Sequence, residues 1–313
     1  MNILITGSEG FVGSHIVDEL CQNADNLIYG IDNLSKHNKE RGIKYKNYTL
    51  FKVDILSNYY KELIHQLQPN IIIDLASLVG GINLLNRNCV ISDMIYNIDL
   101  FNQTFQCAKS LHSLKHFISF STSIVYEKIK TFPTPELKIE DIPIPNSPYG
   151  YYKYTCEYML QNSNLPWTII RPYNCIGVGD DHEHYAHVFT DFIRQAKRDK
   201  KIKVCGGNQI RSFIDCRDVA RAISYIIESN VKTIHKTYNV GNPNNNCYIS
   251  SLAYTIGELL NLDISKDISI IPNYNMLDVG QMEPNIDKIK SELLFFPKYT
   301  LNESLMECIK YYE

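Results

Sequence analysis

Tyr149 and Lys153 are two residues whose types and spacing could perform acid–base chemistry. At the start of a predicted helix, a spacing of four puts the phenol and the ammonium on one face, one turn apart. A nearby cation stabilises a phenolate, so a tyrosine that ordinarily titrates at about pH 10 could act as a base near neutrality. Because the chain has 22 tyrosines, the same spacing also arises by chance, and an exposed helix without catalytic function is the alternative.

Three hydroxyl side chains, those of Ser121, Thr122 and Ser123, lie where an apolar run ends. The run predicts a buried strand over Phe117–Ser121. At the C-terminal end of such a strand, the Thr122 hydroxyl could hydrogen-bond a substrate oxygen that gains or loses a proton. The alternative is that these hydroxyls only cap a following helix.

Gly7, Gly10 and Gly13 form a GxxGxxG pattern between a predicted strand, Ile3–Thr6, and a predicted helix, Ser14–Gln22. Glycines at this spacing allow a tight turn and bring backbone N–H groups against a pyrophosphate at the positive end of the helix. Three glycines in a turn carry little information alone, but their place between a strand and a helix predicts a dinucleotide site.

Asp32 directly follows the second predicted strand, Leu27–Ile31, about 20 residues beyond the glycine-rich loop. A carboxylate there accepts hydrogen bonds from both ribose hydroxyls and repels a 2′-phosphate, which favours NAD over NADP. The alternative is a solvated aspartate in a turn. Asp54, which closes the third strand, could similarly reach the adenine amino group. A bound nicotinamide, being positively charged, would add to the effect of Lys153 on Tyr149.

Short apolar runs alternate with longer helical patterns in the first half of the chain, which is typical of βαβ units and a parallel sheet. The expected strands and helices are Ile3–Thr6, Ser14–Gln22, Leu27–Ile31, Thr49–Val53, Tyr59–Gln66, Ile71–Leu75, Val90–Ser110, Phe117–Ser121, Tyr149–Gln161 and Trp167–Arg171. We therefore predict an α/β fold: a Rossmann-type, doubly wound parallel sheet over residues 1–175, with a smaller substrate-binding domain over 176–313. Later segments are expected to return partly to the first domain.

Composition excludes several classes of protein. The 313 residues are 44% hydrophobic and carry a net charge of −3, so nothing indicates nucleic-acid binding. The nine cysteines contain no CxxC pair, which favours reduced thiols over disulfides or zinc. A strand pattern starts at Asn2 and no apolar run approaches the length of a membrane span, so we expect a cytoplasmic protein without a signal peptide.

Further segments carry a resemblance to a known family. They are Arg171-Pro172-Tyr173-Asn174, Arg211-Ser212-Phe213-Ile214-Asp215, Arg217-Asp218-Val219-Ala220, Tyr238-Asn239-Val240-Gly241 and Pro284-Asn285-Ile286-Asp287-Lys288. With the glycine loop, Thr122 and the Tyr149/Lys153 pair, the chain resembles the extended short-chain dehydrogenase/reductases that act as nucleotide-sugar epimerases and dehydratases. The resemblance implies NAD as cofactor, a nucleotide-diphosphate sugar as substrate, and a homodimer built by the helices that carry Asn97 and Tyr149.

The resemblance also implies which residues form the site. Thr122, Tyr149 and Lys153 would be catalytic. The cofactor would contact Gly7, Gly10, Phe11, Val12, Gly13, Asp32, Asn33, Asp54, Ile55, Leu75, Ala76, Ser77, Asn97, Ser121, Tyr149, Lys153 and Tyr173. The substrate would contact Val79, Gly80, Thr122, Ser123, Asn174, Val188, Val204 and Arg211.

The diphosphate of the substrate would be held by Asn174 and Arg211, because a guanidinium fork suits phosphate oxygens. One departure concerns the same diphosphate. The family often has an arginine near the later P-D pair, where this chain has Gln281 and Met282. Diphosphate binding is then either weaker or supplied by another group.

Relatives that dehydrate, decarboxylate or 3,5-epimerise their sugars place an acidic residue or a cysteine shortly after the threonine. This chain has Ser123 and Ile124 there, and isoleucine has no acidic or basic group. The remaining chemistry needs a hydride and one proton: epimerisation at C4, or as alternatives a C4 oxidoreductase or a 4,6-dehydratase using another group. A catalytically inactive NAD-binding regulator is a distant alternative, because such proteins usually lack the tyrosine or the lysine.

Two further segments leave alternatives open. Val79-Gly80-Gly81-Ile82 resembles a segment of GDP-fucose synthase and GDP-mannose 3,5-epimerase, which could mark a GDP-sugar, or it is only a loop that needs glycine. Asp181-His182-Glu183-His184 and His187 look like metal ligands, but they lack the i,i+4 histidine pair of a helical zinc site. We expect no metal here, and a histidine acting on the sugar is the alternative.

Overall fold

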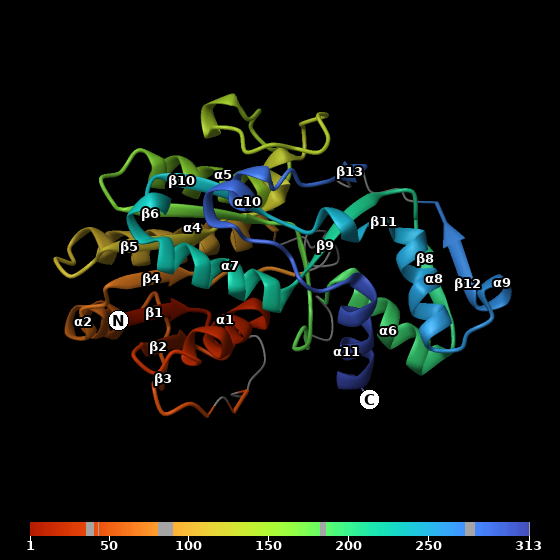
Figure 1. Cartoon of the computed structure of the whole chain (residues 1–313), viewed down its shortest axis with the longest axis horizontal. Helices are drawn as coiled ribbons and strands as arrows, with labels where there is room; N and C mark the ends of the chain where they lie inside the picture. The colour runs from red at the N-terminus through yellow and green to blue at the C-terminus, as the bar shows by residue number, and fades with distance from the viewer. Residues whose placement is uncertain (36–40, 43, 81–89, 182–185, 273–278, 313) are drawn as a thin grey trace.

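Seven parallel strands form the main sheet of the computed structural model, which describes residues 1–35, 41–42, 44–80, 90–181, 186–272 and 279–312 (Figure 1). The strand order is β10-β6-β5-β4-β1-β2-β3. This confirms the predicted doubly wound parallel sheet. The strands are β1 (Asn2–Thr6), β2 (Leu27–Asp32), β3 (Tyr48–Lys52), β4 (Ile71–Asp74), β5 (His116–Phe120), β6 (Trp167–Pro172) and β10 (Lys236–Val240).

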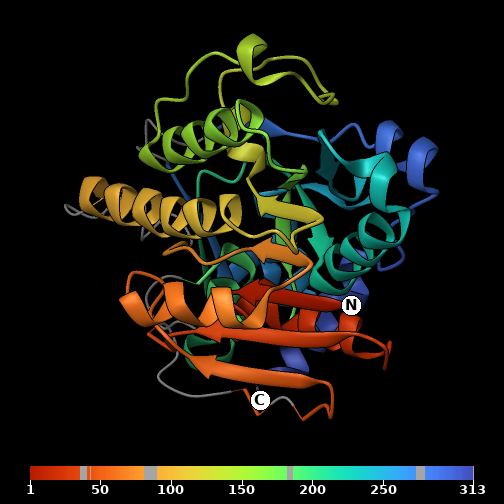
Figure 2. The same ribbon diagram turned by 90° about the vertical axis from the view of Figure 1, so that its left-hand side faces the viewer.

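The apolar runs of these strands are unalternated because helices cover both faces of the sheet. In β1, Ile3 and Ile5 belong to the core on one face and Leu4 to the core on the other, and all three are fully buried. One face is covered by α1 (Phe11–Cys21), α7 (Cys216–Ser229) and α10 (Asp287–Leu293), and the other by α2 (Asn58–Leu67), α4 (Val90–Lys109) and α5 (Pro148–Gln161). Figure 2 shows the sheet between these two layers. Within the described residues, no helix is both long and apolar enough to cross a membrane.

A smaller group of elements packs beside the C-terminal edge of the main sheet (Figure 1). Its core joins α6 (Val188–Asp199) and α8 (Ile249–Leu259) to β8 (Ile202–Cys205) and β9 (Ile210–Asp215). The strands are β7 (Asn174–Ile176), β8 (Ile202–Cys205), β9 (Ile210–Asp215), β11 (Asn246–Tyr248), β12 (Ile268–Ile271) and β13 (Gln281–Met282). The helices are α6 (Val188–Asp199), α8 (Ile249–Leu259), α9 (Ile264–Asp267) and α11 (Leu301–Tyr311), and short 3-10 turns cover Ser123–Tyr126, Ile139–Asp141, Asn230–Thr233 and Pro243–Asn245.

The chain passes between the two groups more than once. After β9 it forms α7 against α1, and then β10, which pairs in parallel with β6 at the edge of the main sheet. The strand order reverses between β4 and β1, so their following loops diverge and leave a crevice at the C-terminal edge.

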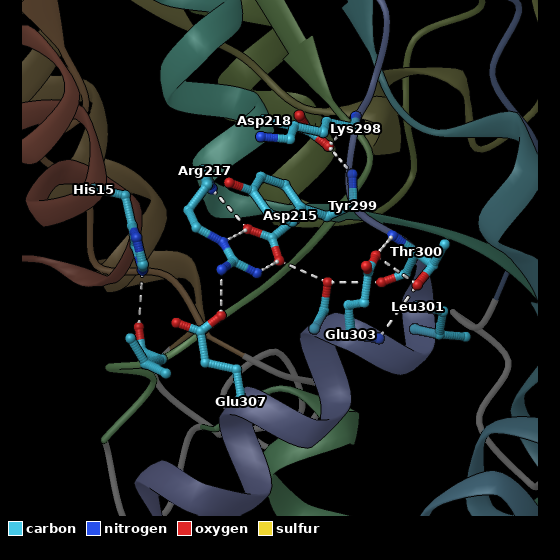
Figure 3. A network of polar contacts seen from close by, with 12 residues as sticks. His15, Asp215, Arg217, Asp218, Lys298, Tyr299, Thr300, Leu301, Glu303 and Glu307 are labelled. Carbon is cyan, nitrogen blue, oxygen red and sulfur yellow. Dashed lines mark hydrogen bonds and ion pairs between the residues drawn. The ribbon is translucent and has the colours of Figure 1, made fainter.

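Polar contacts at the start of α7 anchor the last helix to the rest of the molecule (Figure 3). The buried carboxylate of Asp218 accepts hydrogen bonds from the backbone N–H groups of Lys298 at 2.8 Å and Tyr299 at 3.0 Å. Asp215 accepts a 2.6 Å bond from the Ser304 hydroxyl in α11 and pairs with Arg217 at 2.7 Å. These contacts join the main sheet, through α7, to the group that includes α11.

Candidate active site

A cavity of about 950 Å³ lies where the C-terminal ends of the main strands meet the smaller group of elements. Its lining includes Gly7 after β1, Leu75 after β4 and Ser121 after β5. From the opposite side α6 contributes Val188, and β9 contributes Arg211. The volume and the place are those of a ligand site in an open α/β sheet.

The glycine-rich loop is packed too closely for side chains. Gly7 has a φ of +70°, and a Cβ on Gly13 would lie 2.1 Å from the Gly7 carbonyl oxygen. Because Gly10 is the residue before α1, the helix begins at Phe11, and the prediction of a start at Ser14 was three residues late. The first turn of α1 has no acidic residue and lines the cavity, so a pyrophosphate fits against its N–H groups.

Asp32 ends β2 and lines the cavity, and burial raises the pKa of its carboxyl group. The carboxylate accepts hydrogen bonds from the backbone N–H groups of Glu9 at 3.0 Å and Leu34 at 2.8 Å. These bonds hold the carboxylate beside the glycine-rich loop. The position suits a ribose diol, which would donate to the same oxygens.

Tyr149 and Lys153 lie on adjacent turns at the start of α5, and both line the cavity. The Lys153 ammonium donates a 2.5 Å hydrogen bond to the Phe120 carbonyl at the end of β5. Burial raises the pKa of Tyr149 to about 12, whereas Lys153 and the Thr122 hydroxyl act to lower it. The sequence-based argument had the sign of the lysine effect right but omitted burial, which outweighs it. A positively charged group bound beside the phenol would lower its pKa further, in the same direction as Lys153.

A buried carboxylate, Asp74, acts on the same lysine and was missed by the sequence analysis. It ends β4 and accepts a 3.0 Å hydrogen bond from the Thr6 hydroxyl. Burial raises its pKa to about 6, against the lowering effect of the Lys153 charge. The available signal was its place after three isoleucines at the C-terminal end of β4, which matches the place of Asp32 at the end of β2.

The hydroxyl-rich end of β5 also brings Ile124 and Glu127 to the cavity wall. Thr122 caps the turn that follows, accepting a 3.2 Å hydrogen bond from the Ile124 backbone N–H. Glu127, which the sequence analysis did not consider, accepts hydrogen bonds from the backbone N–H and the hydroxyl of Ser147 and from the Asn146 backbone N–H. Ser147 is the N-cap of α5, so Glu127 holds the start of the helix that carries Tyr149.

Comparisons with known proteins agree with this geometry. The model of the NAD dependent epimerase/dehydratase family matches residues 3–241. The chain belongs to this family. It is 25% identical to an uncharacterised UDP-glucose epimerase of Bacillus subtilis over 99% of the chain and 98% of that protein. It is 29% identical to UDP-glucuronic acid decarboxylase 6 of Arabidopsis thaliana, over 97% of the chain and 87% of that protein.

A solved structure of UDP-glucose 4-epimerase from Thermotoga maritima, with UDP-glucose, is similar over 100% of this chain and 98% of that one. The TM-score is 0.85 and the sequence identity 28%. Members of the epimerase/dehydratase family are NAD-dependent enzymes, and this chain is an enzyme of that kind with NAD as its cofactor. The glycine-rich loop and Asp32 fit that cofactor.

Most of the predicted contact residues of this family member line the cavity. They are Gly7, Gly10, Phe11, Val12, Gly13, Asp32, Asn33, Ile55, Leu75, Ala76, Ser77, Val79, Gly80, Ser121, Thr122, Ser123, Tyr149, Lys153, Tyr173, Asn174, Val188 and Arg211. Gly81, Ile82, His182, Glu183 and His184 lie outside the described residues.

Three predicted residues are placed elsewhere. Val204 is fully buried in the core of the smaller group, and its neighbours Lys203 and Cys205 line the cavity instead, because alternate residues of a strand face opposite sides. Asn97 is buried, and it donates a 3.0 Å hydrogen bond to the Leu78 carbonyl and accepts a 2.7 Å bond from the Leu78 backbone N–H. It therefore supports the loop after β4 from behind.

Asp54 is the third of these residues. It is exposed, and its carboxylate accepts a 2.9 Å hydrogen bond from the backbone N–H of Leu56 in the turn before α2. The residues that line the cavity at this turn are Val53 and Ile55. Asp54 itself does not line the cavity, and its contact with the cofactor stays a prediction.

Proposed function

We propose that this enzyme epimerises a nucleotide-diphosphate sugar at C4 through a 4-keto intermediate. Bound NAD supplies the hydride acceptor and donor. Tyr149 removes the proton of the C4 hydroxyl and returns it at the end, while Lys153 favours the phenolate and Thr122 hydrogen-bonds the same oxygen. Asn174 and Arg211, which line the cavity from β7 and β9, hold the diphosphate.

The observation that supports epimerisation most directly is the side chain of Ile124. It lines the cavity beyond Thr122 and has no acidic or basic group, so it cannot remove a proton from a second sugar carbon. Epimerisation at C4 needs no such removal: the ketone turns within the cavity and receives the hydride on its other face. The likeness to the Thermotoga 4-epimerase, at 28% identity over the full chain, supports the same reaction.

Glu127 supports a second candidate, a 4,6-dehydratase, because its carboxylate also lines the cavity. Both of its oxygens, however, accept hydrogen bonds from Ser147, at 3.1 Å to Oε1 and 3.3 Å to Oε2 from the backbone N–H. The carboxylate is thus engaged in holding the start of α5. We therefore place epimerisation first.

The test is incubation with UDP-, GDP-, CDP- and dTDP-sugars, followed by NMR of the products. A C4 epimer formed without net change in NADH supports the proposal. Stoichiometric NADH, or a 4-keto-6-deoxy product, would replace it with the oxidoreductase or the dehydratase. Tyr149→Phe should keep its NAD and lose turnover, and wild-type rates in this variant would refute the mechanism.

We also propose that the protein is a homodimer through α4 and α5. These helices pack on each other, yet each leaves large apolar side chains in solvent. Ile91 and Ile95 on α4 are 54% and 53% exposed, and Tyr151 and Tyr158 on α5 are 44% and 54% exposed. Large apolar side chains exposed on two neighbouring helices favour an interface there. Sedimentation of Ile91→Lys/Ile95→Lys should show monomers, and a monomeric wild-type protein would contradict the proposal.

A further inference from the structure

Tyr152 lies against both residues of the acid–base pair, and the proposed mechanism gives it no task. It directly precedes Lys153 on α5 and is 2% exposed. Its ring centroid lies 5.5 Å from that of Tyr149 with an interplanar angle of 72°, an edge-to-face arrangement. The Lys153 ammonium nitrogen lies over the Tyr152 ring, 5.2 Å from the centroid. One aromatic side chain therefore contacts the base and its cation.

A chain of hydrogen bonds fixes this ring from its hydroxyl end. The Tyr152 hydroxyl is hydrogen-bonded to the Ser77 hydroxyl. Because Ser77 donates its own proton to the Asn97 amide oxygen at 3.2 Å, its oxygen accepts the proton of Tyr152. Asn97, in turn, is bonded to both backbone polar groups of Leu78. The ring is thus tied to α4 and to the loop after β4, where Ser77 and Leu78 line the cavity.

The chemistry of the contact favours a role for the ring in holding the cation. The face of an aromatic ring carries negative potential and attracts an ammonium, most strongly where water is excluded. Burial raises the pKa of Tyr152 well above its ordinary value, so the phenol stays neutral. A neutral ring can hold the Lys153 ammonium without cancelling its charge, which remains available to lower the pKa of Tyr149.

Other groups act on the same pair. Apart from Tyr152, the described groups that act on Lys153 or Tyr149 are the Phe120 carbonyl, the Thr122 hydroxyl, Asp74 of β4, Cys156 of α5 and Cys175 of β7. When ionised, Asp74 also attracts the ammonium, but its negative charge offsets part of the effect of Lys153 on the phenol. The ring of Tyr152 attracts the ammonium without that opposing effect.

We propose that Tyr152 is a positioning residue for the acid–base pair: the face of its ring holds the Lys153 ammonium beside the Tyr149 phenol. This inference rests on the proposed function. The hydrogen bond to Ser77 keeps the ring in place relative to the cavity. Weakening the negative potential of the ring face should therefore make Tyr149 ionise at higher pH and leave the rest of the reaction unchanged.

The test varies the ring while keeping its shape. Tyr152→Phe is compared with its mono-, di- and trifluorinated phenylalanine counterparts, because each fluorine withdraws negative potential from the ring face. Tyr152→Leu removes the ring. The matched control is Tyr60→Leu, at a tyrosine that is buried in the same core and has its hydroxyl 3.1 Å from that of Thr104.

Two measurements are made on each NAD-loaded protein. Steady-state kinetics with the nucleotide sugar that the substrate panel identifies give kcat and KM against pH. NMR of tyrosine isotope-labelled at Cζ follows the ionisation of Tyr149 without any substrate, and the loss of one signal in Tyr149→Phe assigns it. NAD released on denaturation gives the cofactor content.

We expect the acid limb of the kcat profile and the ionisation of Tyr149 to move together to higher pH with each fluorine, by up to about one unit in all. The kcat of the high-pH plateau, KM and NAD content should stay at the level of Tyr152→Phe. Tyr152→Leu should move the limb in the same direction and lower kcat near neutrality about threefold to tenfold. Tyr60→Leu should lose stability and keep the wild-type limb.

Other outcomes overturn the inference. An acid limb that does not respond to fluorine shows that the ring has no electrostatic effect on the pair. A limb that moves to lower pH in Tyr152→Leu shows that the ring only excludes water, because burial is what raises the pKa of Tyr149. Loss of NAD, or of kcat at every pH, across the fluorinated series assigns Tyr152 to packing. Failure of the whole sugar panel refutes the proposed function instead, and the NMR titration then still decides whether Tyr152 acts on the pair.

Discussion

Replacing Glu157 with glutamine removes one charge of a buried ion pair between α5 and β6. Glu157 lies one turn after Lys153 on α5, and its carboxylate pairs with Arg171 of β6 at 2.6 Å. The two side chains are 2% and 0% exposed. Burial by itself would lower the pKa of Arg171, and the Glu157 charge instead raises it above the ordinary value.

The magnitude follows from the charge that remains. With Glu157 neutral, Arg171 stays buried with polar contacts to the Tyr126 hydroxyl and the Leu137 carbonyl, at 2.8 Å for the carbonyl, and without a countercharge in this pair. Breaking a buried pair from one side typically lowers the free energy of unfolding by about 3–5 kcal/mol. Glutamine still accepts one hydrogen bond, so we expect the free energy of unfolding to fall by about 3 kcal/mol.

The assay is equilibrium unfolding in urea, followed by circular dichroism. Two controls accompany it: Glu157→Met/Arg171→Met, which removes both charges, and Asp199→Asn, which opens an exposed ion pair with Arg198. The double variant should be more stable than Glu157→Gln, because no buried charge is left alone. Asp199→Asn should unfold like the wild type. A loss below about 1 kcal/mol in Glu157→Gln, the range of surface pairs, would refute the reasoning.

Three further predictions follow from the site. Lys153→Met removes the cation that favours the phenolate, so the acid limb of the kcat profile should move to higher pH and activity near neutrality should fall by about 10²-fold or more; an unmoved limb would contradict this role. The pKa of Asp74 is raised from 3.8 to about 6, so its contribution to stability is full below pH 3.8 and is lost as pH rises through 6. In urea unfolding, the free energy of unfolding of Asp74→Asn relative to that of the wild type should therefore rise by up to about 3 kcal/mol between pH 4 and 7. A difference between the two proteins that does not change with pH would disprove the shift. Gly13→Ala places a Cβ 2.1 Å from a backbone carbonyl and should release at least about ninety percent of the bound NAD, whereas Gly280→Ala, with nothing within 4 Å, should retain it; equal retention would show that the loop can relax.

Local patterns in the sequence predicted most of the cofactor side of the site. The glycine loop, Asp32 and the Tyr149/Lys153 pair each depend on spacing within one strand, turn or helix, and such spacing can be read directly from the chain. The parallel sheet was equally predictable, because strands buried on both faces must be apolar at every position. It was harder to predict which side of a strand a single residue faces. Val204 was assigned to the cavity, but its neighbours Lys203 and Cys205 line it instead.

The sequence alone therefore determined the fold class and the cofactor, and it predicted the acid–base pair. Tertiary structure decided how those groups behave. Burial raises the pKa of Tyr149 beyond what Lys153 offsets, and no spacing rule contains that effect. Contacts such as Glu127 with Ser147 and Asp180 with His187 join residues in different elements or across a loop. Their partners are set by how the elements pack, and desolvation and distance then fix their charge states.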